Sequence, residues 1–98
     1  MRTQIVPLIL IFSLMETSAV YAGQEEYSDC ILKYLQGAKL DAATDLIRNA
    51  CYENYGGIFS PTEKVRKYNE CLLEHLGDIE SFHAAMEIRN ACGSKYLR

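Results

Sequence analysis

The feature that most constrains this chain is an internal repeat, in which one segment recurs after 41 residues. Without any gap, residues 27–55 and 68–96 agree at 11 of 29 positions, and the pentapeptide Ile47–Cys51 recurs unchanged as Ile88–Cys92. Self-similarity at one fixed period is the signature of a duplicated structural unit. We therefore predict a single domain made of two copies of one unit. The predicted copies span about residues 27–57 and 60–98.

Each copy has the apolar spacing of two helices. Apolar residues recur at intervals of three and four along both halves of the unit, which is the pattern of one buried helix face. In the first copy these residues are Tyr27, Cys30, Ile31, Tyr34 and Leu35, then Ala43, Leu46, Ile47, Ala50 and Cys51. Gly37 provides a left-handed helix end between the two halves. Since no segment has the alternation of a strand, we predict an all-α fold of four helices in two tandem hairpins.

The linker and the second copy carry further start and stop signals. Ser60–Glu63 predicts a capping box with proline at the first helical position. Asp78 or Ser81 is expected to cap the last helix, which we expect to end before Gly93. Ile58 and Phe59 lie in the linker between the copies. We expect them to fold over the junction of the hairpins, the alternative being an exposed anchor for a partner.

The beginning of the chain has the layout of a secretory signal peptide. Arg2 precedes an apolar run over residues 5–15, and small residues precede Gly23. The run is too short for a membrane-spanning helix, which needs about 20 apolar residues. We therefore predict a signal peptide over residues 1–22 and an exported domain over residues 23–98, periplasmic or secreted, without a membrane span.

The four cysteines lie at regular separations of 21, 20 and 21 residues. Export places them in an oxidising compartment, where two disulfides are the usual outcome. Of the three possible connectivities, we favour Cys30–Cys51 with Cys71–Cys92, because each hairpin then carries its own pair at similar heights on antiparallel helices. The competing pairing, Cys51–Cys71 with Cys30–Cys92, would join the hairpins to each other. A zinc site is disfavoured since no two cysteines form a close Cys-x₂₋₄-Cys pair.

Composition and motifs narrow the function. A net charge of −3 argues against nucleic-acid binding, which normally needs a basic face. No sequence motif of a hydrolase, a metalloprotease or a phosphate-binding loop is present. We therefore expect no enzymatic activity and no cofactor.

A few residues are candidates for an interaction surface. Arg48 and Arg89 are repeated and could hold a carboxylate or phosphate as a pair, although Arg48 could instead pair with Asp45 one turn earlier. Tyr52 falls off the apolar stripe, as expected for a contact residue. The predicted interaction surface comprises Arg48, Arg89, Tyr52 and Phe59.

The two histidines offer an alternative site. His75 and His83 lie on either side of the turn that follows Leu76, where they could bind a metal or respond to pH. The first copy has Tyr34 and Ala42 at the matching positions, so the scaffold itself does not require histidine there.

The repeated unit also resembles known proteins. Its pattern is Tyr-x-x-Cys-x-Leu-x-x-Leu, a glycine turn, and then Asp41-Ala-Ala-x-x-Leu-Ile-Arg-x-Ala-Cys51. This pattern resembles cysteine-paired helical segments in uncharacterised exported bacterial proteins, although Phe82 stands in place of Asp41 in the second copy. The resemblance implies an envelope or secreted location and no activity.

Together these observations predict a small exported protein-interaction module whose partner is another exported or envelope protein. The alternative is a carrier of a small ligand or metal, with a site between the hairpins near His75 and His83.

Overall fold

The computed structural model describes residues 22–98, and the predicted signal peptide lies outside this range except for its last residue. The elements are α2 (Ala22–Tyr34), α3 (Asp41–Cys51), a π-helical turn η2 (Tyr52–Gly56), α4 (Glu63–His75) and α5 (Phe82–Tyr96). No strand occurs among residues 22–98. The predicted all-α fold with four helices is confirmed.

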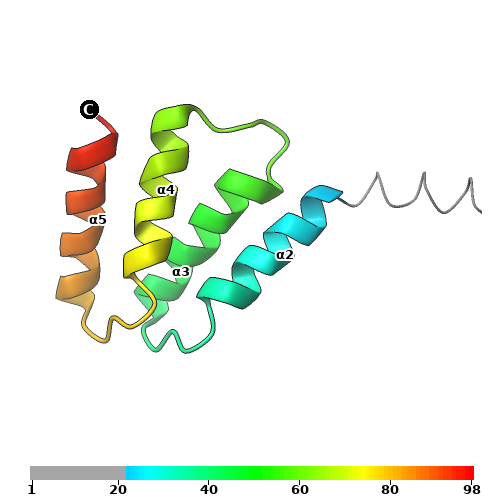
Figure 1. Cartoon of the computed structure of the whole chain (residues 1–98). Helices are drawn as coiled ribbons and strands as arrows, with labels where there is room; N and C mark the ends of the chain where they lie inside the picture. Colours follow the sequence, from blue (N-terminus) through cyan, green and yellow to red (C-terminus); the bar gives the residue numbers. More distant parts are fainter. Residues whose placement is uncertain (1–21) are drawn as a thin grey trace, which may run out of the picture.

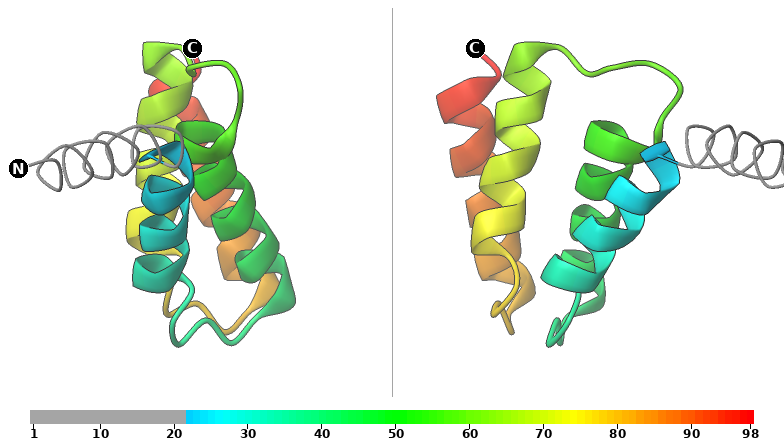
Figure 2. Two further views of the ribbon diagram at one scale, coloured as in Figure 1. Left: turned by 90° about the vertical axis from the view of Figure 1, so that its right-hand side faces the viewer. Right: turned by 45° about the vertical axis from the view of Figure 1, so that its right-hand side comes forward.

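The helices form two antiparallel hairpins that lie side by side. Across Figure 1 they follow the order α5, α4, α3, α2, and a longer connection joins the hairpins at the end opposite their two short turns. The right-hand view of Figure 2 separates the pair α2 and α3 from the pair α4 and α5. Helix α3 packs against α2, α4 and α5. The contact between α3 and α4 therefore joins the two copies of the repeat.

Each hairpin is closed by its own disulfide. The bonds are Cys30–Cys51, with Cα atoms 5.7 Å apart, and Cys71–Cys92, with Cα atoms 5.8 Å apart. The predicted pairing within each hairpin is therefore confirmed. Each bond closes a loop of 21 residues, which in the chain-entropy model stabilises a small domain by about 3 kcal/mol.

The two copies contribute unequally to the core, although their sequences correspond. Ala50 on α3 is 1% exposed, whereas its repeat counterpart Ala91 on α5 is exposed. The reverse holds for the first helix of each unit: Leu73 on α4 is 3% exposed, and its counterpart Leu32 on α2 is 62% exposed. Helices α3 and α4 are covered where the two hairpins meet. The corresponding faces of their repeat counterparts, α5 and α2, are more exposed.

The helix ends correct one sequence prediction and decide between the two alternatives of another. The N-cap of α4 is Thr62, whose Oγ1 accepts a hydrogen bond from the Val65 amide at 3.3 Å, so the capping box predicted at Ser60 was placed two residues too early. Thr62 has the extended backbone of an N-cap residue, with φ −66° and ψ 163°, so the helix starts at Glu63. Of the two caps considered for α5, Ser81 serves, with its Oγ accepting from the Ala84 amide at 3.0 Å.

The two glycines predicted to end helices play different roles. Gly37 has a φ of 82° and ends the first hairpin helix as predicted. Gly93 was expected to end α5, but it lies inside that helix, which continues to Tyr96. A Cβ atom at Gly93 would lie 3.8 Å from the Tyr68 ring, so this glycine is where α4 packs on α5 rather than a stop signal.

A polar contact fixes how the hairpins dock. Asn69 on α4 is 1% exposed, and its Nδ2 donates to Oδ1 of Asn54 in η2 at 2.9 Å. The Asn54 Nδ2 in turn donates to the Arg66 carbonyl at 3.3 Å. Because a buried amide without a partner is costly, this pair favours one register of the two hairpins over the others.

Gly56 allows the π-helical turn to pack tightly against α2. A Cβ atom at Gly56 would lie 3.1 Å from ring atoms of both Tyr27 and Tyr52. These two rings pack edge to face, with centroids 6.3 Å apart. Neither ring can move away from an added methyl group without losing this contact.

We predict that Gly56→Ala lowers the free energy of unfolding by about 1–3 kcal/mol, the usual cost of overpacking. The neighbouring Gly57→Ala is the matched control, because its added Cβ would meet only ordinary contacts of 3.7 Å or more. That control should change stability by no more than about 0.5 kcal/mol. Urea unfolding of both variants measures the difference, and equal losses would contradict the packing argument.

Candidate functional site

The most exposed apolar residues lie in the connection between the hairpins. Ile58 is 93% exposed and Phe59 is 85% exposed. The expectation that they fold over the hairpin junction is therefore wrong. The π-helical turn η2 lies against α4 there, with Asn54 hydrogen-bonded to Asn69 and to the Arg66 carbonyl, so the connection runs outside this contact. The alternative, in which these residues are exposed, describes the structure.

These residues border a hollow of about 480 Å³, which we call the tip hollow. It is lined by Tyr52, Glu53, Gly57, Ile58, Phe59, Ser60, Pro61, Thr62 and Val65. Two predicted contact residues, Tyr52 and Phe59, therefore meet in one place. Tyr52 is 54% exposed, and its ring makes an edge-to-face contact with the ring of Tyr27.

A second hollow of about 480 Å³ adjoins the first along the hairpin interface, and we call it the α3/α4 hollow. It is lined by Leu46, Asn49, Ala50, Tyr52, Glu53, Tyr68, Asn69 and Leu72. Tyr52 and Glu53 belong to both hollows. Glu53 is the one charged residue among the described residues that line them, and it gives this otherwise neutral surface a negative centre.

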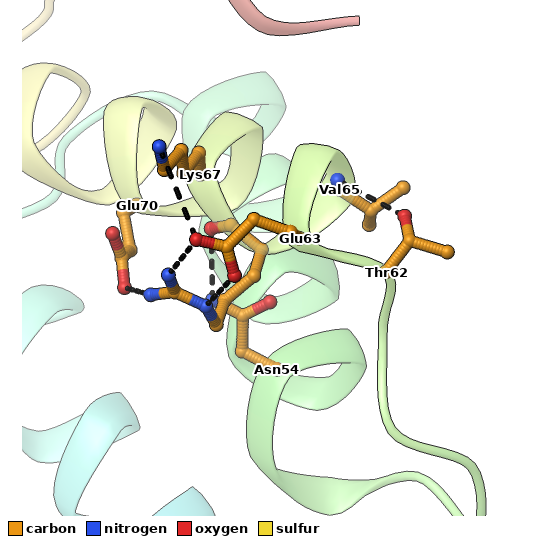
Figure 3. A network of polar contacts seen from close by, with 7 residues as sticks. Asn54, Thr62, Glu63, Val65, Lys67 and Glu70 are labelled. Atoms are coloured by element: carbon orange, nitrogen blue, oxygen red, sulfur yellow. Dashed lines mark hydrogen bonds and ion pairs between the residues drawn. The ribbon is translucent and has the colours of Figure 1, made fainter.

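The start of α4 is held by a network of ion pairs directly beside the tip hollow (Figure 3). Arg66 donates to both carboxylate oxygens of Glu63, from Nη2 at 2.8 Å and from Nε at 3.3 Å, and its Nη1 also bonds Glu70. The Nζ atom of Lys67 lies 3.9 Å from Oε2 of Glu63. The hydrogen bond and the positive charge of Arg66 hold the pKa of the Glu63 carboxyl below its usual value. Asn54 lies against the same helix through its bond to the Arg66 carbonyl.

The repeated arginines do not converge on one site. Arg48 pairs with Asp45 at 3.4 Å, which is the outward ion pair considered from the sequence. Arg89 lies on α5 and lines a separate hollow that also includes Arg98. The structure therefore leaves the two guanidinium groups on different helices and in different electrostatic surroundings.

The two histidines are exposed at the ends of their helices. His75 lies in the last turn of α4, and His83 lies in the first turn of α5, where its Nε2 is 3.6 Å from Glu87 Oε1. Within residues 22–98, no group of three or more His, Cys, Asp or Glu side chains is placed to hold a metal ion.

Sequence reasoning missed Glu53 and Asn54. Both lie where the second copy departs from the first, with Ser94 and Lys95 at the matching positions. The signal that could have identified them is that the two copies differ at these positions, next to the linker. The element found there, η2, occurs in the first copy.

Comparison with known proteins identifies a family. A family model described as "Four-cysteine protein VF_A0006-like" matches residues 7–96. No curated protein and no solved structure matches the chain. In the described part of the chain, no helix has both the length and the apolar character needed to cross a membrane.

We predict that the ion pair between Glu63 and Arg66 makes stability depend on pH. Because folding lowers the pKa of Glu63, its contribution to stability is fully present above the usual glutamate pKa of 4.5 and is lost as the pH falls through the lowered pKa. The difference in melting temperature between wild type and Glu63→Gln should therefore shrink below pH 4.5. Thermal unfolding from pH 7 to pH 2 measures it. In an Arg66→Gln background the same substitution should show a weaker pH dependence, and an unchanged one would contradict the assignment.

Proposed function

The chain belongs to the family of four-cysteine VF_A0006-like proteins, and we propose that it is a small exported module without catalytic activity that binds another exported or envelope protein. The observation that carries the proposal is the pair of exposed side chains, Ile58 and Phe59, held next to Tyr52 and Glu53 at the junction of two disulfide-closed hairpins.

Three observations support export. All four cysteines form disulfides, which persist in oxidising compartments. Residues 1–22 have the charge, apolar run and small residues of a signal peptide. A cut before Gly23 would leave Cys30, its disulfide to Cys51 and the packing of α2 on α3 within the exported domain.

The binding surface we propose is the tip hollow together with the adjoining α3/α4 hollow. Large apolar and aromatic side chains supply most of the energy at the centre of protein interfaces. Glu53 lies between the two hollows and has no ion-pair partner among residues 22–98. A complementary partner therefore presents an apolar side chain to Phe59 and Tyr52 and a lysine or arginine to Glu53.

The surface is held in place before binding. Tyr52 packs on Tyr27, Asn54 bonds α4, and Pro61 restricts the end of the connection. A surface ordered in advance loses less conformational freedom on binding, so more of its contact energy appears as affinity.

The alternative function, a carrier of a small ligand or metal near His75 and His83, stays a prediction. Both side chains are exposed, His75 in the last turn of α4 and His83 in the first turn of α5.

We predict that export removes 22 residues. The chain expressed with its own leader should be recovered beginning at Gly23, as measured by mass spectrometry of the intact protein. Ala22→Phe places a large residue at the last position before the cut and should leave most of the product uncleaved. Ala19→Phe, outside the two positions that the peptidase reads, is the matched control and should be processed normally. Recovery of wild type beginning at Met1 would contradict the proposal.

We predict that the tip hollow contacts the partner. A photo-crosslinking residue in place of Ile58 should capture one protein in the native compartment, through a segment with an apolar residue near a lysine or arginine. The same residue in place of Phe82, which is 61% exposed at the start of α5, is the control and should capture little.

Charge reversal then tests the role of Glu53. Glu53→Lys should lower the crosslinked fraction by about tenfold, because it places like charges against each other. Glu74→Lys, exposed near the far end of α4, should leave capture unchanged. Equal capture from Phe82, or capture that survives Glu53→Lys, would exclude this surface as the binding site.

A further inference from the structure

The outer face of α5 is the repeat counterpart of the α3 face that meets the second hairpin. A hollow of about 530 Å³ on α5 is lined by Ala84, Glu87, Ile88, Asn90 and Ala91. The matching positions on α3 are Ala43, Leu46, Ile47, Asn49 and Ala50. Of these, Ala43, Ile47 and Ala50 are buried, whereas their counterparts Ala84 and Ile88 are half-buried and Ala91 is exposed. The face that α4 covers on α3 is therefore left uncovered on α5.

Helix α2 carries the other half of the same contact. On α4, the stripe toward the first hairpin consists of Asn69, Leu72, Leu73 and Leu76, all buried. The matching residues on α2 are Ser28, Ile31, Leu32 and Leu35, which are exposed or half-buried. The clearest difference is that Leu32 is 62% exposed whereas Leu73 is 3% exposed. One molecule thus presents both halves of an interface that it already uses internally.

We propose that a second copy of this chain docks its α2 against α5 of the first, with the antiparallel geometry in which α4 packs on α3. This contact is heterologous, because it joins two different surfaces of identical molecules. Each added copy again exposes α5 at one end and α2 at the other. The assembly then extends in the way that stacked repeats extend within one chain.

The charges of the two helices favour this pairing. The first half of α2 is acidic, with Glu25, Glu26 and Asp29. From Ile88 to the end of the sequence at Arg98 there are three basic residues, one of which is Arg89, and no acidic residue. In an antiparallel contact the beginning of α2 lies beside the end of α5, so opposite charges meet.

The repeat explains why α5 is basic there. In the first copy Arg48 is flanked by Asp45, which pairs with it, and by Glu53. In the second copy the corresponding residues are Met86 and Ser94. Arg89 therefore has no carboxylate at the positions that flank Arg48, and no ion pair of Arg89 occurs within residues 22–98.

The hairpin turns repeat a complementary pair as well. Lys39 and Glu80 occupy matching positions of the two copies and form an ion pair at 3.7 Å inside the chain. In the proposed assembly, Glu80 of one molecule would face Lys39 of the next, so the same two charges can recur at each contact.

We expect the association to be weak. One helix pair buries less than the roughly 1,600 Å² of a standard interface. The buried pair Asn54–Asn69 is also absent from it, since Lys95 and Ser28 occupy the matching positions. A dissociation constant of about 10 µM to 1 mM is therefore expected at low salt, rising with ionic strength because the contact is charged.

The test is sedimentation velocity of the purified protein, with both disulfides formed, from 10 µM to 1 mM. The sedimentation coefficient of wild type should rise with concentration. Leu32→Glu and Ala91→Glu should each raise the dissociation constant by about tenfold or more. Both positions are exposed in the monomer, so circular dichroism should show that both variants fold.

Mixing the two variants distinguishes this contact from a symmetric dimer. Leu32→Glu keeps an intact α5 face and Ala91→Glu keeps an intact α2 face, so an equimolar mixture should form a 1:1 dimer that grows no further. Ile58→Ser, at the tip hollow, should self-associate like wild type, which separates this proposal from the partner surface above. A wild type that stays monomeric to 1 mM, or a mixture that fails to pair, would overturn the proposal.

Discussion

The packing of α3 against α4 is the contact on which the rest of the structure depends. Each hairpin closes itself with a disulfide, but a hairpin alone leaves one apolar helix face in water. Docking the second helix of one copy on the first helix of the next covers Ala50 and Leu73 and buries Asn69. The same docking brings η2 against α4, and the connection that must span the two hairpins is left at the surface with Ile58 and Phe59 exposed.

Much of the fold could be predicted from the sequence, because the repeat carries local information twice. Helical spacing in both copies specified two hairpins, and one cysteine on each helix at a separation of 21 residues matched the geometry of a disulfide between antiparallel helices. Which of two corresponding residues is buried could not be predicted from the repeat. Ile47–Cys51 and Ile88–Cys92 are identical, and only the docking of the hairpins makes Ala50 buried and Ala91 exposed.

The candidate site was predicted in part. Tyr52 was identified because it falls off the apolar stripe, and it does border the tip hollow with Phe59. The expectation for Ile58 and Phe59 failed for a tertiary reason. The contact of η2 with α4 through Asn54 closes the junction at this end, and the connection passes outside it with both side chains exposed. The π-helical turn could not be predicted either. It depends on Gly56 fitting against the rings of Tyr52 and Tyr27, and Tyr27 is distant in sequence.

A duplicated chain can change one copy while the other preserves the fold, and the departures from the repeat here lie mainly on surfaces rather than in the core. Glu53 and Asn54, which have Ser94 and Lys95 as counterparts, contribute a charge to the tip hollow and a hydrogen bond between the hairpins. The positions that both copies retain include the small residues of the α3 and α5 faces. Burial accounts for their retention on α3. On α5, where Ala91 is exposed, the proposed docking of α2 from a second copy would account for it, because α2 carries the exposed Leu32 and the acidic residues that this contact requires.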